Sequence, residues 1–175
     1  MEPRGRKSSR RRRRWQSLLA AAVLIAAGTC ARADTADGVA ALKRGEYIHA
    51  LAELEGPAKA GDPVAQANLG AIYHYGLGVP ADFTSAFKWY RAAALQGNID
   101  GELGLAVLYA FGKGVEPDLA IARMWLSVAA DAMPPSPDRL RVSEDLDAIA
   151  KRLTPADLKR SDDLVKAWYA TRTAP

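Results

Sequence analysis

Two consecutive stretches of this chain are imperfect copies of each other. Residues 62–97 and 98–133 align without a gap at a period of 36, and ten positions carry the same residue in both. A repeat of this length is typical of stacked helical hairpins, each of which needs a neighbour to bury its apolar face. It therefore predicts an all-α fold, a short right-handed α/α solenoid of helical hairpins. The matched residues are Leu69 with Leu105, Tyr73 with Tyr109, Gly76 with Gly112, Gly78 with Gly114, Val79 with Val115, Asp82 with Asp118, Ala86 with Ala122, Trp89 with Trp125, Ala93 with Ala129 and Ala94 with Ala130.

Each copy contains the signals that end one helix and begin the next. Over residues 64–75 apolar side chains recur at spacings of three and four, which predicts an amphipathic helix. Gly76 and Gly78 follow, and glycine is favoured just past a helix because it accepts left-handed backbone. Asp82, like Asp118 one period later, stands where its carboxylate can accept hydrogen bonds from the first amides of a new helix. We expect that helix to begin one residue after each aspartate.

The second helix of each repeat combines small and very large residues. Ala86, Ala93 and Ala94 keep one stripe of the helix small, so that a neighbouring helix can approach closely. Trp89 and Trp125 are expected to fill the remaining space in the core. The alternative is that these tryptophans are platforms for stacking a ligand.

The repeat resembles the Sel1-like repeat, a relative of the tetratricopeptide repeat. Tetratricopeptide repeats run at 34 residues and lack the G-x-G-V loop found in both copies here. The second copy departs from the pattern at Gly101, Ala106 and Met133. The first copy follows it at Ala65, Leu69, Gly70, Tyr73, Gly76, Gly78, Val79, Asp82, Ala86, Trp89, Ala93, Ala94 and Gly97.

Helical segments are expected on both sides of the two copies. Residues 34–61 are interpreted as a degenerate first repeat with a short leading helix. Residues 136–171 predict a helical cap built from helices over 138–153 and 155–171, the second with a capping threonine at Thr154 and an acid at Asp157. The residues expected on the inner side of the cap are Leu140, Leu146, Ile149, Leu153, Leu158, Leu164, Val165 and Trp168.

The first 33 residues have the pattern of a cleavable secretion signal. A basic stretch over residues 4–14 precedes an apolar core at 18–27, and Ala31-Arg32-Ala33 fits an A-x-A cleavage site. The apolar core is about half the length needed to span a bilayer. We therefore expect export, to the periplasm, with cleavage after Ala33 and no stable membrane insertion afterwards. A retained anchor, lipidation at Cys30 and twin-arginine export are the alternatives.

Cleavage of that segment would reverse the net charge of the protein. The whole chain carries +4, whereas residues 34–175 hold fifteen basic and nineteen acidic side chains, a net −4. Nucleic-acid binding depends on a basic surface and is not expected from this remainder. Because Cys30 is the only cysteine, the remainder cannot form disulfides within itself.

The resemblance implies a binding role. Sel1-like proteins are similar to scaffolds and adaptors that present a concave surface to another protein, and exported bacterial members include regulators of envelope signalling. We therefore predict a non-enzymatic protein–protein interaction module with an unidentified protein partner; a structural spacer in an envelope complex is one alternative.

The first helices of successive repeats are expected to line the inner face. Their unmatched positions include two sets that each share a helical face: Asn68, Ala71 and Tyr75, then Gly104, Val107 and Phe111. Among them the candidate partner-binding residues are Asn68, Tyr75, Val107 and Phe111, with the two aromatic rings as anchors. The alternative is that both rings pack beneath the G-x-G-V loops.

A hydrolase acting on cell-wall or β-lactam material is the enzymatic alternative. Ser85 and Lys88 match S-x-x-K, and cysteine-rich secreted Sel1-like relatives have been discussed as penicillin-binding. The accompanying S-D-N and K-T-G motifs are absent, and Ile121 and Met124 replace the pair in the next copy. We therefore predict no catalytic residue.

Neither a metal nor a cofactor is expected. His49 and His74 are the two histidines, they belong to different repeats, and no cysteine accompanies them, so we predict surface or helix-end positions for both. The acidic pairs Glu144-Asp145 and Asp162-Asp163 are adjacent in sequence, which separates them by about 100° on a helix. They are expected to be solvated.

Overall fold

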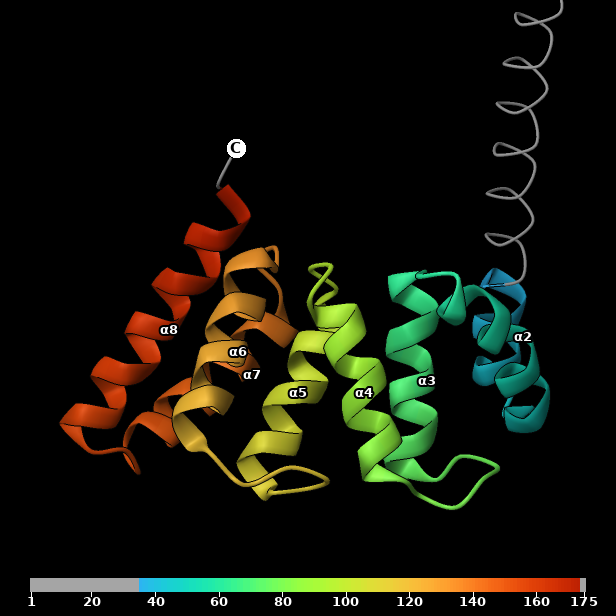
Figure 1. Ribbon diagram of the computed structural model, residues 1–175, viewed down its shortest axis with the longest axis horizontal. Helices are drawn as coiled ribbons and strands as arrows, with labels where there is room; N and C mark the ends of the chain where they lie inside the picture. The colour runs from blue at the N-terminus through green and yellow to red at the C-terminus, as the bar shows by residue number, and fades with distance from the viewer. Residues whose placement is uncertain (1–34, 174–175) are drawn as a thin grey trace, which may run out of the picture.

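The computed structural model describes residues 35–173, and the predicted secretion signal, residues 1–33, lies outside them. Every regular element in the described part is a helix, which confirms the predicted all-α solenoid. In Figure 1 helices α2 to α6 follow one another in chain order along the long axis of the molecule, and α8 lies at the end opposite α2. After a helix over residues 35–43 come α2 (Tyr47–Lys59), α3 (Pro63–Tyr75), α4 (Phe83–Ala94), α5 (Ile99–Phe111), α6 (Leu119–Ala132), α7 (Pro137–Ala150) and α8 (Pro155–Thr173).

The aspartate caps that the sequence predicted are confirmed. Asp82 Oδ1 accepts hydrogen bonds from the amides of Thr84 and Ser85, both at 3.0 Å, and α4 begins at the next residue, Phe83. Asp118 accepts equivalent bonds from the second and third residues of α6. Such a cap stabilises a helix by about 1 kcal/mol, because it satisfies amides that have no partner inside the helix.

The glycine ends of the first helices are confirmed as well. Gly76 and Gly112 follow α3 and α5 directly and have φ values of +66° and +64°. Their amides donate to the carbonyls of Ile72 and Leu108, four residues earlier. A side chain at either position would strain this left-handed backbone, so glycine allows the chain to leave each helix in the same direction.

The rest of each G-x-G-V loop also packs alike in the two copies. A Cβ on Gly114 would lie 2.5 Å from the carbonyl oxygen of Phe83, so this glycine lets the loop rest against the start of α4. Gly78 meets Tyr47 of α2 in the same way, at 2.8 Å from its Cβ. Each loop therefore packs on the second helix of the preceding repeat. The valines that follow, Val79 and Val115, and the matched tyrosines, Tyr73 and Tyr109, are partly buried against the core.

The matched leucines and alanines are buried in both copies, as their repetition predicted. In the second copy Leu105, Ala122, Ala129 and Ala130 are at most 8% exposed. The close helix approach expected along the alanine stripe is present too, since a Cβ on Gly101 of α5 would lie 2.7 Å from that of Ala93. Their counterparts in the first copy, each 0% exposed, are Leu69, Ala86, Ala93 and Ala94.

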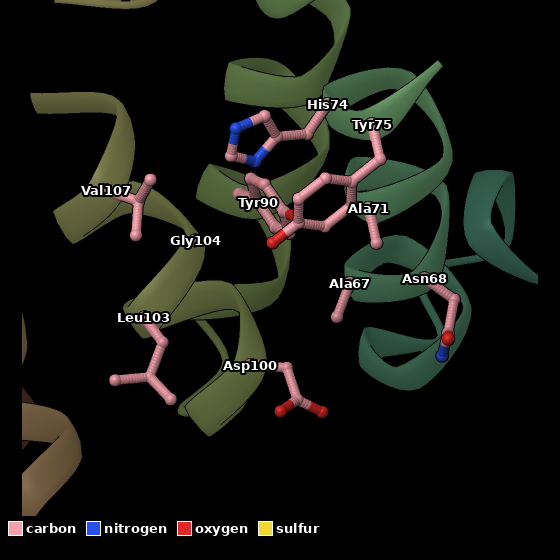
Figure 2. A pocket seen from close by; sticks show the side chains of 10 residues that line it. All are labelled: Ala67, Asn68, Ala71, His74, Tyr75, Tyr90, Asp100, Leu103, Gly104 and Val107. Carbon is pink, nitrogen blue, oxygen red and sulfur yellow. The ribbon is translucent and has the colours of Figure 1, made fainter. Parts of the chain in front are cut away.

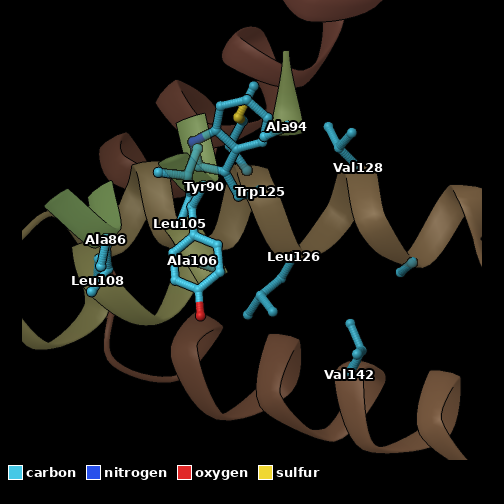
Figure 3. Packing of buried hydrophobic residues seen from close by; sticks show 12 residues of the cluster. Ala86, Tyr90, Ala94, Leu105, Ala106, Leu108, Trp125, Leu126, Val128 and Val142 are labelled. Carbon is cyan, nitrogen blue, oxygen red and sulfur yellow. The ribbon is translucent and has the colours of Figure 1, made fainter. Parts of the chain in front are cut away.

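The buried residues form two clusters along the solenoid. The first lies around α2 and α3 and includes Leu54, Leu69 and Ile72. The second runs from α4 to α7, where Leu126 and Val142 point toward each other (Figure 3). Consecutive helices α2 to α6 pack against one another in turn, and α6 also contacts α7 and α8. Each helical pair therefore completes its core with residues from the next pair, as expected of a solenoid.

The two tryptophans of the repeats belong to this packing. Trp125 is buried, and its ring meets that of Trp168 in α8 edge to face, with centroids 4.9 Å apart. Trp89 is partly buried against the first cluster. Their contacts are with other core side chains, so the geometry favours the packing interpretation over the ligand-stacking alternative.

The cap departs from the sequence prediction in α7. Leu140 was expected to face the core but is 67% exposed, and Val142 is the buried residue of this helix. Val142, Leu146 and Ile149 follow one another at spacings of four and three, so they share a face from which Leu140 is rotated by about 200°. Leu153 was placed within the helix, yet α7 ends at Ala150 and a turn follows.

The last helix is fastened to the second repeat by charged side chains. Arg160 of α8 lies 2.6 Å from Asp118, and Arg123 of α6 lies 2.6 Å from Asp162. Asp118 therefore both caps α6 and holds α8. The predicted start of α8 is confirmed, since Thr154 Oγ1 accepts from the Asp157 amide at 3.2 Å.

A carboxyl group is buried at the start of α5. Glu102, in the first turn of α5, is 2% exposed, and its Oε2 has no hydrogen-bond partner. Burial raises the pKa of Glu102 to about 7, although the nearby Arg172 of α8 acts in the opposite direction. The same carboxyl contributes to the raised pKa of Tyr169, after burial and Asp131. Ionised Glu102 is therefore poorly compensated in the folded protein.

Replacing Glu102 with glutamine should stabilise the protein at high pH. The pKa of about 7 in the folded protein exceeds the ordinary 4.5, so the folded protein holds this proton more tightly than the unfolded chain. Stability is therefore lost as the pH rises from about 4.5 to about 7. We expect Glu102→Gln to raise the free energy of unfolding by about 3 kcal/mol at about pH 8 and to change it little at about pH 4.

Urea denaturation followed by circular dichroism measures this difference. Glu116→Gln is the matched control, because Glu116 is exposed in the loop before α6 and the same substitution there should have little effect at either pH. An equal change in stability at both pH values for Glu102→Gln would contradict the prediction.

Candidate binding groove

Two first helices of the repeats, α3 and α5, form the walls of a hollow of about 280 Å³ (Figure 2). We call it the α3–α5 groove. Three candidate partner-binding residues, Asn68, Tyr75 and Val107, line it, so the structure brings together residues from both repeats. Its lining consists of Ala67, Asn68, Ala71, His74, Tyr75, Tyr90, Asp100, Leu103, Gly104 and Val107.

The ring of Tyr90, from α4, forms the floor of the groove and is 4% exposed. It fits because both neighbouring helices carry glycine where they meet it. A Cβ atom on Gly70 of α3 would lie 2.5 Å from Tyr90 Cδ1, and one on Gly104 of α5 would lie 2.6 Å from the same atom. These distances are far below van der Waals contact, so the two glycines allow α3 and α5 to approach the ring from either side.

Tyr90 is a residue of the groove that the repeat pattern does not reveal. Its counterpart one period later is Leu126, so the comparison of the two copies left it among the unmatched positions. Gly104 was placed on a helical face with Val107, but its packing role was not foreseen. A glycine inside a helix was the available signal, since such a residue is unfavourable unless something large approaches the backbone closely.

His74 lies at the upper end of the groove in Figure 2 and is 5% exposed. The prediction of a surface position was therefore wrong, although His74 does stand in the last turn of α3. Its ring stacks on Tyr75, with centroids 4.5 Å apart and planes within 10°, and it meets the rings of Phe83 and Tyr90 edge to face. Side chains from α4 thus cover the end of α3.

The surroundings of His74 favour its neutral form. Burial lowers the pKa of the imidazole, and the charge of Lys113 lowers it further. Its Nδ1 is buried without a hydrogen-bond partner. The groove therefore contains an uncharged, partly unsatisfied polar group at pH 7.

The groove has one exposed aromatic wall and one charged side chain. Tyr75 is 67% exposed, and Figure 2 shows its ring reaching across the hollow between His74 and Asp100. Asp100, in the first turn of α5, is the charged residue of the lining. Asn68 donates from Nδ2 to the carbonyl of Val64 at 2.8 Å, which leaves its amide oxygen available to a ligand.

Phe111 lies in a second, adjoining hollow of about 240 Å³, which we call the Phe111 hollow. Val107 lines both hollows. Phe111 is 72% exposed and Tyr75 is similarly open, so the alternative that both rings pack beneath the loops is wrong. The Phe111 hollow is lined by Ala106, Val107, Ala110, Phe111, Leu126, Asp145, Ala148, Ile149 and Arg152.

The S-x-x-K pair is not assembled for catalysis. Ser85 Oγ lies 2.5 Å from Asp82 Oδ2, so the hydroxyl donates to the capping carboxylate. Lys88 is exposed on α4, and neither residue lines the two hollows. The hydroxyl therefore takes part in the helix cap, and it lies outside both hollows.

Histidines and acids do not gather into a metal site in the described part of the chain. No group of three or more His, Cys, Asp or Glu side chains among residues 35–173 is arranged to hold a metal ion. His49 lies exposed on α2, and its Nδ1 is 4.0 Å from Glu53.

Comparison with known proteins identifies the repeats. A family model described as Sel1 repeat matches residues 63–98 and 99–132. The chain contains two Sel1 repeats. Sel1 repeats are typically protein–protein interaction modules, and the fold is generally a non-catalytic scaffold. The two matched segments contain both walls of the α3–α5 groove.

Solved structures of Sel1 repeat proteins share the fold. One is a protective antigen with an SLR fold from uropathogenic Escherichia coli strains, with a TM-score of 0.72 and 28% identity over 79% of this chain. Another is a Sel1 repeat protein from Oxalobacter formigenes, with a TM-score of 0.53 and 31% identity over 56% of this chain. The chain spans 29% and 40% of the lengths of these two proteins. Comparison with curated proteins finds no match.

Within residues 35–173, no helix combines the length and the apolar character that a membrane-spanning helix needs.

Gly104→Ala should destabilise the Sel1 repeats. The added methyl would overlap the Tyr90 ring between α4 and α5, and overpacking of this kind costs about 1–3 kcal/mol. Gly56→Ala is the matched control, because a Cβ there meets no atom within 4 Å and alanine is favoured in a helix. Thermal and urea unfolding measure both variants.

A double substitution tests whether Tyr90 is the cause. The Tyr90→Leu substitution copies Leu126 of the next repeat. In that background, Gly104→Ala should lower the free energy of unfolding by less than it does when Tyr90 is present. If Gly104→Ala lowers the free energy of unfolding equally with tyrosine or leucine at position 90, the Tyr90 ring does not cause the destabilisation.

Proposed function

We propose that this Sel1 repeat protein is an exported adaptor or regulator of the cell envelope, which binds another protein through the α3–α5 groove and the Phe111 hollow. One observation carries the proposal. Two large aromatic rings, Tyr75 and Phe111, stand 67% and 72% exposed at adjoining hollows on successive first helices. Rigid aromatic side chains beside a pocket are the residues that most often dominate binding energy at protein interfaces.

The groove has the composition of an interface core with a few orienting polar groups. Small apolar residues such as Ala67 and Ala71 leave room above the Tyr90 floor. His74 and Asn68 supply hydrogen-bonding groups at the walls. Open hollows of this kind suit the side chains of a protein partner better than a buried small-molecule ligand.

Export is the part of the proposal that rests on the sequence. The basic stretch, the short apolar core and Ala31-Arg32-Ala33 support secretion followed by cleavage, and a periplasmic location supports a role in envelope signalling or assembly. Mass spectrometry of the protein purified from its native envelope tests this point. We expect the purified protein to start at Asp34. A purified protein that still contains residues 1–33 would contradict cleavage.

The hydrolase alternative receives no support from the geometry around Ser85. Its hydroxyl donates to Asp82, and the pair with Lys88 opens onto neither hollow. Purified protein should therefore leave nitrocefin unhydrolysed. Turnover that disappears in Ser85→Ala would support the enzyme instead.

Replacing Tyr75 and Phe111 together with alanine should abolish partner binding. Both rings are exposed, so their removal should leave helicity and unfolding unchanged while it removes the anchors of the interface. We expect recovery of cross-linked partners from the native envelope to fall by at least about tenfold, since each anchor commonly contributes more than 1 kcal/mol.

The control must remove the same kind of surface elsewhere. Ile48 and Leu140 are 63% and 67% exposed and line neither hollow, so Ile48→Ala combined with Leu140→Ala should leave recovery intact. Unchanged recovery of all partners by the Tyr75 and Phe111 variant would overturn the proposed binding face and favour the structural-spacer alternative.

A further inference from the structure

We infer that the α3–α5 groove receives a lysine or arginine side chain from an extended segment of the partner polypeptide, while an apolar side chain of the same segment occupies the Phe111 hollow. The inference rests on the proposed function, because it names the chemistry of the partner that this face binds. It follows from the charge, the aromatic surface, the size and the continuity of the two hollows.

The charge of the groove selects a cation. Asp100 is its charged lining residue, it is exposed, and among the described residues no hydrogen bond or ion pair engages its carboxylate. Figure 2 shows the carboxylate at the lower end of the hollow. His74, at the opposite end, is neutral at pH 7 because burial lowers its pKa, so it does not oppose a bound cation. An ammonium or guanidinium group would give Asp100 the partner that it lacks.

Aromatic rings complete the cation site. Tyr75 and Tyr90 both line the groove, and in Figure 2 their rings lie between His74 and Asp100. The pKa of the Tyr90 phenol is raised first by burial and then by the charges of Tyr75 and Asp100, which reflects how near the carboxylate lies to this ring. A cation held beside the carboxylate and against the exposed ring of Tyr75 gains from both contacts.

A competing positive charge fixes which end of the groove the cation occupies. Lys113 Nζ lies over the ring of Phe83, 5.0 Å from its centroid, and its charge contributes to the lowered pKa of His74. A second cation near His74 would be repelled by Lys113. The cationic side chain is therefore expected at the Asp100 end.

Size and continuity point to a polypeptide. The groove, at about 280 Å³, lies at the lower limit of the roughly 300–1,000 Å³ of pockets that enclose drug-sized ligands, and it has room for a long side chain. Val107 lines both hollows, so a chain that enters one can continue into the other. Leu126, Ile149 and Phe111 make the second hollow largely apolar, and its Asp145 and Arg152 carry opposite charges. An apolar residue suits it best.

A displayed library of random 12-residue peptides provides the probe. Peptides would be selected on the full-length protein after depletion on the Tyr75→Ala and Phe111→Ala double variant, so that the survivors depend on the groove. We expect the survivors to share one lysine or arginine and one apolar residue. Synthetic copies would then be measured by fluorescence anisotropy.

The decisive comparison is a double-substitution cycle. Replacing the selected arginine by neutral citrulline, or the lysine by acetyl-lysine, should weaken binding to the unaltered protein by at least about tenfold, the effect of one charge-assisted contact. On Asp100→Asn the same replacement should change affinity less than about twofold. Asp100 is exposed, so this variant should fold, and circular dichroism checks it. Asp138→Asn, which removes an exposed acid of α7 outside both hollows, should retain the tenfold difference.

Each result decides for or against the inference. Groove-dependent peptides that tolerate citrulline, or that lose as much affinity on Asp100→Asn as on the unaltered protein, would overturn it and leave the proposed function standing. Failure to recover any groove-dependent peptide would count against both. Free agmatine that binds as tightly as the selected peptides would replace the polypeptide by a small organic cation.

Discussion

The contact on which the repeat stack and its groove both depend is the ring of Tyr90 between two glycines. Gly70 of α3 and Gly104 of α5 have no Cβ to hold the helices away from the ring, which lies between them in the packing and is 4% exposed. The same ring forms the floor of the α3–α5 groove and contacts His74 edge to face. A core contact therefore sets the distance between the walls of the candidate binding surface.

The remaining elements keep this surface open and in place. The Asp82 and Asp118 caps and the left-handed glycines after α3 and α5 give both repeats the same turn, so their first helices present corresponding faces to one hollow. At the C-terminal end, α8 closes the solenoid through the Arg160–Asp118 ion pair and the contact of Trp168 with Trp125. Near this end lies the buried carboxyl group of Glu102, and its elevated pKa makes the stability of the fold depend on pH.

Much of the fold and part of the site could be predicted because they depend on residues close together in sequence. The two aspartate caps and the helix ends follow from residues a few positions apart, and each signal occurs in both copies. The spacing along each first helix also singled out Asn68, Tyr75 and Val107, which line one groove. The errors concern burial. His74 was expected at the surface or at a helix end, and it stands at the end of α3 but is covered by Phe83 and Tyr90. Leu140 was assigned to the core although Val142 is the buried residue of its helix. Phe111 was expected to share a binding face with Tyr75, yet it lines a different hollow.

The sequence by itself determined the period, the helical hairpins, their caps and the family, because each is encoded by local backbone preferences that recur at a spacing of 36. Only the tertiary structure decided that Tyr90 fills the space left by Gly70 and Gly104, and that Asp100, Tyr75 and His74 border one hollow. The physical reason is that burial and the shape of a cavity are set by side chains arriving from other helices, and a pattern read along one helix does not contain them.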